Sequence, residues 1–212
     1  MGSASRGSAD WLGYGMPVAS PVVQERKAST IADDMLRYVE GDRSAFDRIY
    51  TSTAPRLLGY LAGLLADRAA AEDALQQTFI RLHDARDAYV RGADPLPWIF
   101  TIAHRVALDE LRRRRRARVR LALTDDPLPE PHADLDGSAA GSADLPDERL
   151  HVTLAALAHL PENQRAALLL TKLEGRSVAE AAEIAGTTAG AIKLRAHRAY
   201  ITLRRILAKE SS

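Results

Sequence analysis

The stretch SVAEAAEIAGTTAGAIKLRAHR, residues 177–198, decides the expected fold of the C-terminal part of the chain. Ser177 is followed three residues later by Glu180, which is the pairing of a capping box, so a short helix is expected to start there. Gly186 marks a turn, and one of the two threonines that follow it caps a longer helix reaching about Lys209. These are the parts of a helix-turn-helix, whose second helix enters the major groove of DNA.

The longer of these two helices is expected to have a core side and a basic side. It holds six Lys and Arg residues and no acidic residue up to Lys209. Cations there would neutralise DNA phosphates and release counterions, although a solvated basic face is the alternative, since cations favour helix C-termini. The core side repeats at spacings of four, three, four and three: Ile192, Ala196, Ala199, Leu203 and Ile206. The candidate DNA contacts are Thr188, Lys193, Leu194, Arg195, His197 and Arg198.

Leu194 is two residues from Ile192, so it is expected to point away from the core side. An apolar side chain on a base-reading face can touch the methyl group of thymine. A single exposed leucine is equally ordinary on a protein surface, and the sequence leaves both interpretations open.

Upstream of the motif, helices are predicted over 150–160, ending before Pro161, and over 163–173, closing at Gly175. Residues 149–212 are therefore expected to form one small helical domain. The preceding stretch, 121–148, carries eight acidic residues, no Lys or Arg and several prolines. Such a segment cannot bury enough apolar surface to offset its ordering entropy, which predicts a flexible acidic linker.

Residues 30–120 are predicted to form a second all-helical domain, because apolar residues recur at helical spacing between turn signals. The expected helices run from Asp33 to Gly41, over 44–65, over 69–89, and from Pro95 into an arginine-rich stretch. Pro55 is expected to kink or break the second of these helices, since proline removes a backbone donor.

Arg112 to Arg116 are five consecutive arginines, and eight arginines between 104 and 120 face only Asp109 and Glu110. An anionic partner is the economical explanation for such a run. A solvated helix end, or a patch that clamps the acidic linker, is the alternative.

The composition limits the classes of protein that remain. The chain has 212 residues, a net charge of +1 and no cysteine, which excludes disulfides and thiolate metal sites and suits a reducing cytoplasm. The longest apolar stretch, 57–66, is too short to span a bilayer, and the N-terminus does not resemble a signal peptide. Residues 1–29 are expected to be a disordered tail, in which the apolar island 11–16 is either spare sequence or a short docking motif.

No catalytic arrangement is recognisable. The chain has no glycine-rich phosphate loop, and its six histidines are scattered without metal-ligand spacing. Catalytic residues, metals and cofactors are therefore not predicted, and the protein is not expected to be an enzyme. His104 and His197 lie in basic segments, where they can contact phosphate.

Six motifs, in order along the chain, resemble those of bacterial RNA polymerase sigma factors of the sigma-70 superfamily. They lie at 71–79 (AEDALQQTF), 97–103 (PWIFTIA), 108–113 (LDELRR), 160–165 (LPENQR), 174–182 (EGRSVAEAA) and 190–199 (GAIKLRAHRA). The resemblance spans about 33 to 208 apart from the linker, and the two-domain form is similar to the extracytoplasmic-function group. Gln77 and Leu194 depart from the family, which commonly has Glu and often has Ser at these positions.

The resemblance implies two domains with different functions: a region 2 domain over 30–120 and a region 4 domain over 149–212. Region 2 would bind the β′ clamp helices of core RNA polymerase through the polar face of its third helix and would open the −10 element. The implied polymerase contacts are Glu72, Asp73, Gln76, Gln77 and Phe79. The implied −10 contacts are Trp98, Thr101, Arg105, Arg112 and Arg113, with an extruded base held by the loop over 89–97.

Region 4 would read the −35 element of promoter DNA and rest against the β flap, with the acidic linker in the RNA exit path. The family usually has an anti-sigma partner that is often anchored in the membrane. The resemblance therefore implies a cytoplasmic, nucleoid-associated protein that such a partner could hold at the membrane. Trp98 can stack on a base or serve as a core anchor, and the sequence leaves both roles open.

Two other functions of the whole protein also remain open. One is a helix-turn-helix regulator that binds operators without polymerase, and the other is a module whose first domain is mainly the target of a regulatory protein.

Overall fold

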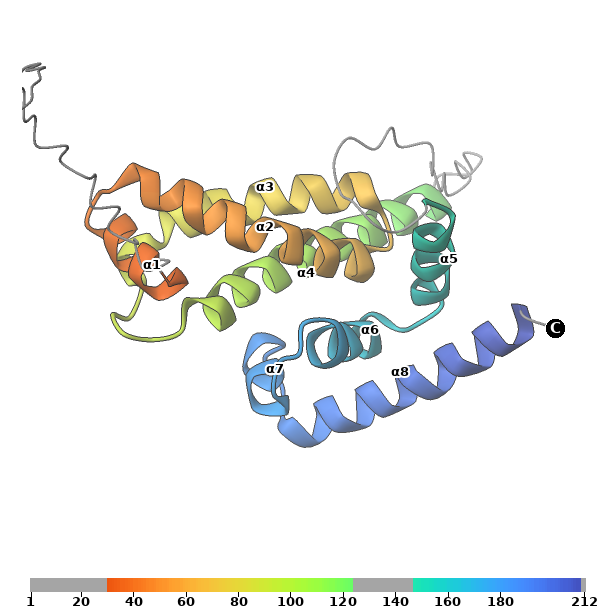
Figure 1. Cartoon of the computed structure of the whole chain (residues 1–212). Coiled ribbons are helices and arrows are strands. Elements are labelled where there is room, and N and C mark those ends of the chain that lie inside the picture. Colours follow the sequence, from red (N-terminus) through yellow and green to blue (C-terminus); the bar gives the residue numbers. More distant parts are fainter. Residues whose placement is uncertain (1–29, 124–146, 211–212) are drawn as a thin grey trace, which may run out of the picture.

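The computed structural model describes residues 30–123 and 147–210, and every regular element within these ranges is a helix (Figure 1). This confirms the all-helical expectation. The predicted N-terminal tail and most of the predicted linker lie outside the described residues. Within the described ranges, no helix is long and apolar enough to cross a membrane.

The elements fall into an N-terminal and a C-terminal group. The N-terminal group is α1 (Ile31–Val39), α2 (Arg43–Leu65), α3 (Arg68–Asp84), the short 3₁₀ helix η1 (Arg86–Ala88) and α4 (Pro95–Leu123). The C-terminal group is α5 (Asp147–Ala158), α6 (Glu162–Leu168), the π-helical turn η2 (Leu169–Leu173), α7 (Val178–Ile184) and α8 (Ala189–Glu210). Helix α4 thus continues three residues into the stretch that was expected to be linker.

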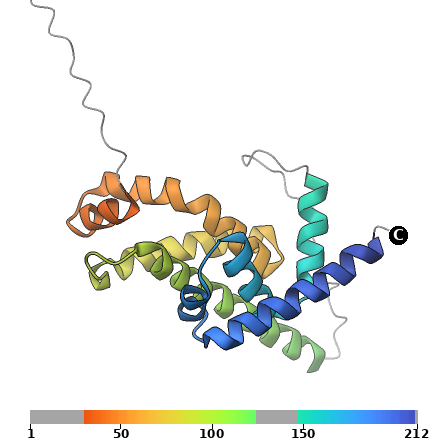
Figure 2. The ribbon, with the colours of Figure 1, turned by 60° about the horizontal axis from the view of Figure 1, so that its bottom comes forward.

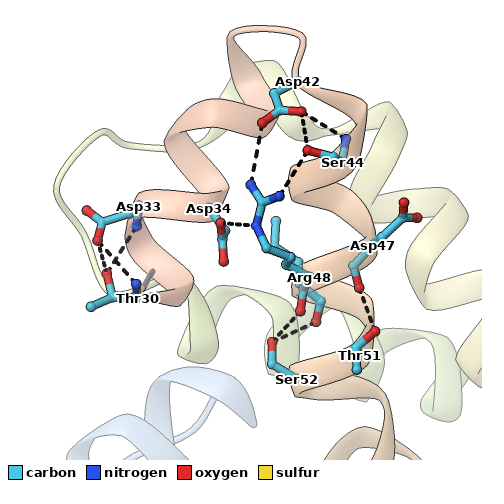
Figure 3. Close-up of polar contacts among 10 residues, drawn as sticks. Thr30, Asp33, Asp34, Asp42, Ser44, Asp47, Arg48, Thr51 and Ser52 are labelled. Atoms are coloured by element: carbon cyan, nitrogen blue, oxygen red, sulfur yellow. Dashed lines mark hydrogen bonds and ion pairs between the residues drawn. The ribbon is translucent and has the colours of Figure 1, made fainter. Parts of the chain in front are cut away.

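The corner between α1 and α2 is fixed by one arginine (Figure 3). Arg48 of α2 donates from Nε to Asp34 of α1 at 2.7 Å and lies 3.4 Å from Asp42, the residue that caps α2. Asp34 is buried, so the charged hydrogen bond compensates for removing its carboxylate from water. The neighbouring cap is also satisfied, because Asp42 accepts the backbone N–H of Ser44.

Helix α2 continues through Pro55, so of the two expected outcomes, a kink or a break, the break does not occur. A proline inside a helix costs about 3 kcal/mol, because it removes one hydrogen bond and crowds the preceding turn. The core-facing side chains before and after Pro55 are fully buried, including Ile49, Leu57 and Leu61. Burial of each such side chain stabilises the fold by about 1.5–3 kcal/mol, so core packing outweighs the local cost.

Helix α3 ends at Asp84, earlier than the expected end at 89, and the chain continues through η1. The loop after η1 has a defined geometry. The Tyr89 hydroxyl donates to the carbonyl oxygen of Ala93, Gly92 takes a positive φ of 85°, and Asp94 accepts the backbone N–H of Leu96 at 3.0 Å. The loop therefore leads directly into α4, whose first turn holds Pro95 as expected for proline.

The C-terminal group confirms the helix-turn-helix. Ser177 and Glu180 form the predicted capping box at the start of α7, and the turn that follows contains Gly186 with a φ of 59°. Thr188 is the threonine that caps α8, since its hydroxyl accepts the backbone N–H of Ala191 at 3.2 Å. Ile192 and Ala199 are almost fully buried on the predicted core side of α8.

The two groups of helices pack directly against each other. Helix α2 contacts α5, α6 and η2, and helix α4 contacts α7. Figures 1 and 2 show α6, α7 and α8 on one side of α2 and α4, with α7 next to α4 and with α8 farther out, whereas α5 lies at the end of α2. The buried apolar residues of both groups form one continuous cluster.

Candidate nucleic-acid interface

Helix α8 presents the predicted basic face to solvent. Lys193, His197 and Arg198 are exposed and Arg195 is half-buried. Within the described ranges, none of these four side chains forms an ion pair or hydrogen bond. Leu194 is 50% exposed on the same face. A helix of a helix-turn-helix with unpaired cations and one apolar side chain facing outward can contact phosphates and base edges together.

The start of α4 holds the other candidate DNA contacts in a different environment. Trp98 is half-buried, and its ring lies 5.8 Å from that of Tyr89. Thr101 donates its hydroxyl to the carbonyl oxygen of Pro97 at 2.8 Å, whereas Arg105 is exposed and has no partner among the described residues. The Trp98 ring is therefore anchored on one side without being enclosed, which leaves both of its expected roles compatible with the geometry.

Sequence reasoning named the loop over 89–97 but missed what gives it shape, namely Tyr89 and Asp94. Tyr89 is buried, and burial raises the pKa of its hydroxyl, with the nearby Asp94 carboxylate adding to the effect. The signal was present in the sequence: an aromatic residue, a glycine and an Asp-Pro pair at the entrance to a helix are typical of a structured turn.

The arginine run of α4 divides into three kinds of side chain. Arg112 and Arg113 are exposed and pair along their own helix with Asp109 and Glu110. The exposed pair of Arg112 with Asp109, at 3.5 Å, contributes little to stability, so Arg112 remains available to an anionic partner. Arg113 binds the largely buried Glu110 carboxylate through two hydrogen bonds, at 2.7 and 2.9 Å, and is held more firmly. Arg116 and Arg118 are exposed, with no ion pair among the described residues.

Arg114 and Arg115 instead face other helices. Arg114 is 29% exposed and lies 2.8 Å from both Asp67, the cap of α3, and Glu110. Burial disfavours its charged form, but the hydrogen bonds to Glu110 and Asp67 outweigh this and raise the pKa of Arg114. Arg115 reaches Glu162 of α6 at 3.2 Å. Arg114 therefore joins α3 to α4, whereas Arg115 makes an exposed ion pair to α6.

The polar face of α3 is exposed as predicted, at Glu72, Asp73, Gln76 and Gln77. Phe79 is different: only 5% of it is exposed, and its ring packs against those of Phe46 and Tyr50. It belongs to the core of the N-terminal domain and supports the polar face from beneath, because its position aligns with the buried stripe of α3.

Ile80 was missed in the sequence. It is 52% exposed on α3, three and four residues after Gln77 and Gln76, and so continues the same face. The spacing of Ile80 from Gln76 and Gln77 could have identified it as part of this exposed face. An exposed apolar side chain beside four polar ones is suited to a protein partner.

His104 does not contact phosphate from its basic segment, because it is buried. Its Nδ1 lies 2.7 Å from the Tyr60 hydroxyl. Burial and the neighbouring positive charge of Arg105 lower the pKa of His104 to about 4, so the ring is neutral at pH 7. Its role is in the core of the N-terminal domain.

Comparisons with known proteins agree with this arrangement. Residues 49–117 match the family model for sigma-70 region 2, and residues 150–203 match a model for sigma-70 region 4. The RNA polymerase sigma factor CarQ of Myxococcus xanthus is 37% identical over 173 residues, covering 82% of this chain and 95% of that protein. The ECF RNA polymerase sigma factor SigC of Mycobacterium tuberculosis is 33% identical over 164 residues, covering 77% of this chain and 84% of that protein.

Two solved structures share the fold. The sigma factor RpoE of Bartonella quintana, in complex with the anti-sigma factor NepR, has a TM-score of 0.60 and 28% identity, covering 77% of this chain and 96% of that one. CnrH, in complex with the cytosolic domain of CnrY, has a TM-score of 0.63 and 21% identity, covering 84% of this chain and 97% of that one.

Proposed function

This chain belongs to the sigma-70 family, in the extracytoplasmic-function group of RNA polymerase sigma factors, and from that premise we propose which of its surfaces carry each step of initiation. As a sigma factor it binds core RNA polymerase, and it directs promoter recognition, DNA melting and transcription initiation at a specific set of promoters. The assignment of residues to these steps, and of a role without any catalysis of its own, is our proposal.

The −35 element is assigned to α8, through Thr188, Lys193, Leu194, Arg195, His197 and Arg198. The observation that supports this most is the set of unpaired cations beside exposed Leu194 on the second helix of a capped helix-turn-helix. Because its cations have no acidic partner in the described chain, DNA phosphates can bind them without first breaking an ion pair.

The −10 element is assigned to the start of α4 and the loop before it, with Trp98, Thr101 and Arg105 near the bases. Extruding a base from the duplex costs a few kcal/mol, and a preformed loop that ends on a half-buried indole offsets part of this cost by stacking. Arg112 and Arg113 are assigned to the DNA backbone, since both are exposed; Arg112 is weakly paired, whereas Arg113 is held in place by Glu110.

The polymerase clamp is assigned to the exposed face of α3, that is Glu72, Asp73, Gln76 and Gln77, with Ile80 added and Phe79 supporting them from the core. The β flap is assigned to the C-terminal domain. An anti-sigma factor is a further proposed partner, supported by the complex of the related sigma factor of B. quintana. Because these partners act in transcription, we place the protein in the cytoplasm, on the nucleoid or held at the membrane by such a partner.

The assignment of α8 is tested by two charge-matched variants in transcription with core polymerase. Arg195→Ala removes a cation from the proposed reading face, whereas Arg205→Ala removes an exposed cation nearly three turns farther along the same helix. We expect Arg195→Ala to lower initiation about five- to 150-fold and Arg205→Ala to lower it less than twofold, because one lost base or phosphate contact costs about 1–3 kcal/mol. Equal effects of the two variants would overturn the assignment.

A further inference from the structure

One buried arginine of the C-terminal domain has no partner. Arg165 of α6 is 6% exposed, and its Nε atom is buried without a hydrogen-bond partner. Its side chain forms no ion pair or hydrogen bond with any residue that the structure describes. Burial lowers the pKa of this guanidinium, and the charge of Glu162 opposes the shift. A buried cation without a partner is costly, so its presence requires an explanation.

Other shielded arginines of the chain do have carboxylate partners. Arg114 has the two described above. Arg176, whose side chain is 8% exposed, lies 3.4 Å from Glu180 and 3.9 Å from Asp94. Arg165 is shielded to a similar degree and has neither kind of compensation. The difference indicates that the partner of Arg165 is a group from outside the described chain.

Arg165 lines an open hollow of about 490 Å³, at the place where α4 passes the turn between α5 and α6. Arg115 and Arg118 of α4 line the same hollow, and the turn contributes Leu160 and Pro161. Sites for small molecules typically have volumes of about 300–1,000 Å³. The unpartnered guanidinium therefore borders a space that a small molecule can enter.

The charges around the hollow leave two cations without compensation. Glu162 is the carboxylate among its described lining residues, and it is already paired with Arg115 at 3.2 Å. Arg118 is exposed and has no ion pair within the described ranges. A dianion would match the charges of Arg118 and Arg165 together. Asn163, which is exposed at the same hollow, adds an amide donor.

These features fit a terminal phosphate group better than the phosphates of a DNA strand. A phosphate monoester carries about −1.5 to −2 charges at pH 7, whereas each phosphate within a DNA strand carries a single charge. A guanidinium group binds phosphate through two parallel N–H bonds. A terminal phosphate can also approach an almost fully buried side chain, whereas a phosphate within a strand is flanked by sugars on both sides.

We propose that this hollow is a binding site for a small molecule that carries a terminal phosphate group. Arg165 and Arg118 bind the phosphate oxygens, and Asn163 donates a further hydrogen bond. The organic part of the molecule lies along Leu160 and Pro161. None of these residues is assigned above to the −10 or the −35 element, so the site does not rest on the proposed function.

Isothermal titration calorimetry of the full chain tests the site. The buffer is free of phosphate and its ionic strength is held constant, because salt screens exposed charges. The probes are adenosine monophosphate, which is a phosphate monoester, cyclic adenosine monophosphate, which is a diester with one charge, and adenosine. We expect one monophosphate to bind per chain with a Kd of about 1 mM or lower. The cyclic diester should bind about tenfold more weakly, and adenosine more weakly still.

Helix α4 offers two charge-matched variants. Arg118→Ala removes a cation from the hollow, whereas Arg116→Ala removes an exposed cation that does not line it. Arg118→Ala should raise the Kd for adenosine monophosphate about tenfold and Arg116→Ala less than about twofold, because only the first loses a charge-assisted hydrogen bond. Both side chains are exposed, so neither change should disturb folding.

Arg165→Met tests the buried cation itself. Methionine is flexible enough to fill the space and carries no charge, so the variant should fold without the cost of a buried, unpaired cation. Adenosine monophosphate should raise the melting temperature of the unsubstituted protein, because a ligand that binds only the folded state stabilises it. It should leave the melting temperature of Arg165→Met unchanged. Circular dichroism checks that each variant keeps its helices.

The proposal is overturned if adenosine monophosphate does not bind with a Kd of about 1 mM or lower. Equal binding of the monophosphate and the cyclic diester, or equal effects of Arg118→Ala and Arg116→Ala, would also overturn it, as would a rise in melting temperature that persists in Arg165→Met. A short DNA duplex provides the last arm: if Arg165→Met weakens binding of the duplex while the monophosphate does not bind, the cation belongs to a DNA contact. These measurements need no polymerase, so their failure is distinguishable from failure of the promoter assignments.

Discussion

The Tyr60 hydroxyl and Nδ1 of His104 lie 2.7 Å apart inside the N-terminal domain, with both side chains buried. Burial lowers the pKa of His104 to about 4, below the ordinary value of 6.5, and the positive charge of Arg105 adds to this shift. A neutral imidazole with its proton on Nε2 can accept the hydroxyl hydrogen at Nδ1, whereas an imidazolium cannot.

This pair makes stability depend on pH. Between pH 6.5 and about 4 the unfolded chain binds a proton at His104 that the folded chain does not. The stability it contributes is therefore complete above pH 6.5 and falls as the pH drops toward 4, by up to about 3 kcal/mol. Chemical unfolding of the protein at pH 7.5 and 4.5 measures this. His104→Gln should flatten the dependence, and His197→Gln on the exposed face of α8 should leave it unchanged. Equal pH dependence in all three proteins would contradict the account.

Arg114 is expected to matter for folding more than for DNA. It joins the cap of α3 to Glu110 of α4 while partly buried, so Arg114→Ala should lower the free energy of unfolding by about 1–2 kcal/mol. For a domain of this size that corresponds to a melting temperature lower by about 4–8 °C per kcal/mol. Arg116→Ala, an exposed neighbour without an ion pair in the described chain, should not change the melting temperature. A larger loss from Arg116→Ala would show that the division of the arginine run is wrong.

The capping box of α7 should set the stability of the helix-turn-helix. Ser177→Ala removes the hydroxyl that accepts the backbone N–H of Glu180, which costs about 1 kcal/mol, whereas glycine at a cap costs only a few tenths. Thermal unfolding should therefore rank Ser177→Ala below Ser177→Gly, with the unsubstituted protein the most stable. Alanine and glycine variants of equal stability would mean that the hydroxyl does not cap the helix in solution.

Leu194 should affect promoter choice without affecting stability. Its side chain is 50% exposed on the proposed reading face, so Leu194→Ser removes no core contact. Selection of promoter fragments from a randomised −35 pool should lose a preference for thymine at one position, because serine offers no apolar contact to the methyl group. Leu207→Ser, at a similarly exposed position near the end of α8, is the control and should keep the original preference. An unchanged preference in Leu194→Ser would remove this residue from the interface.

The helix-turn-helix was predictable because each local signal agreed with the next. The Ser177–Glu180 box, the glycine turn and the stripe from Ile192 all act within a few residues of one another, so sequence spacing alone specifies them. The exposed basic face of α8 followed from the same spacing. Where local propensity and tertiary packing disagree, as at Pro55, the expected break of the helix does not occur, because the burial that offsets the proline comes from distant segments.

The contacts between the domains could not be predicted for the same reason. Gly63 looks like an unfavourable residue in a helix until Leu169, more than 100 positions away, occupies the space beside it. Arg56 and Glu174 are likewise ordinary surface charges in the sequence, and only the packing of α2 against η2 makes them partners. Phe79 was assigned to a partner surface because it ends a motif, although its helical position places it with the buried residues.

The central claim is that this chain directs core RNA polymerase to promoters through two separate DNA-reading surfaces. Run-off transcription with core polymerase and a pool of genomic promoter fragments, with and without the protein, tests it most directly. We predict initiation that depends on the protein, at sites sharing two elements about 16 to 17 base pairs apart, which two modules can read on successive groove faces. Binding to duplex DNA without any initiation would contradict the claim and favour a regulator that acts without polymerase.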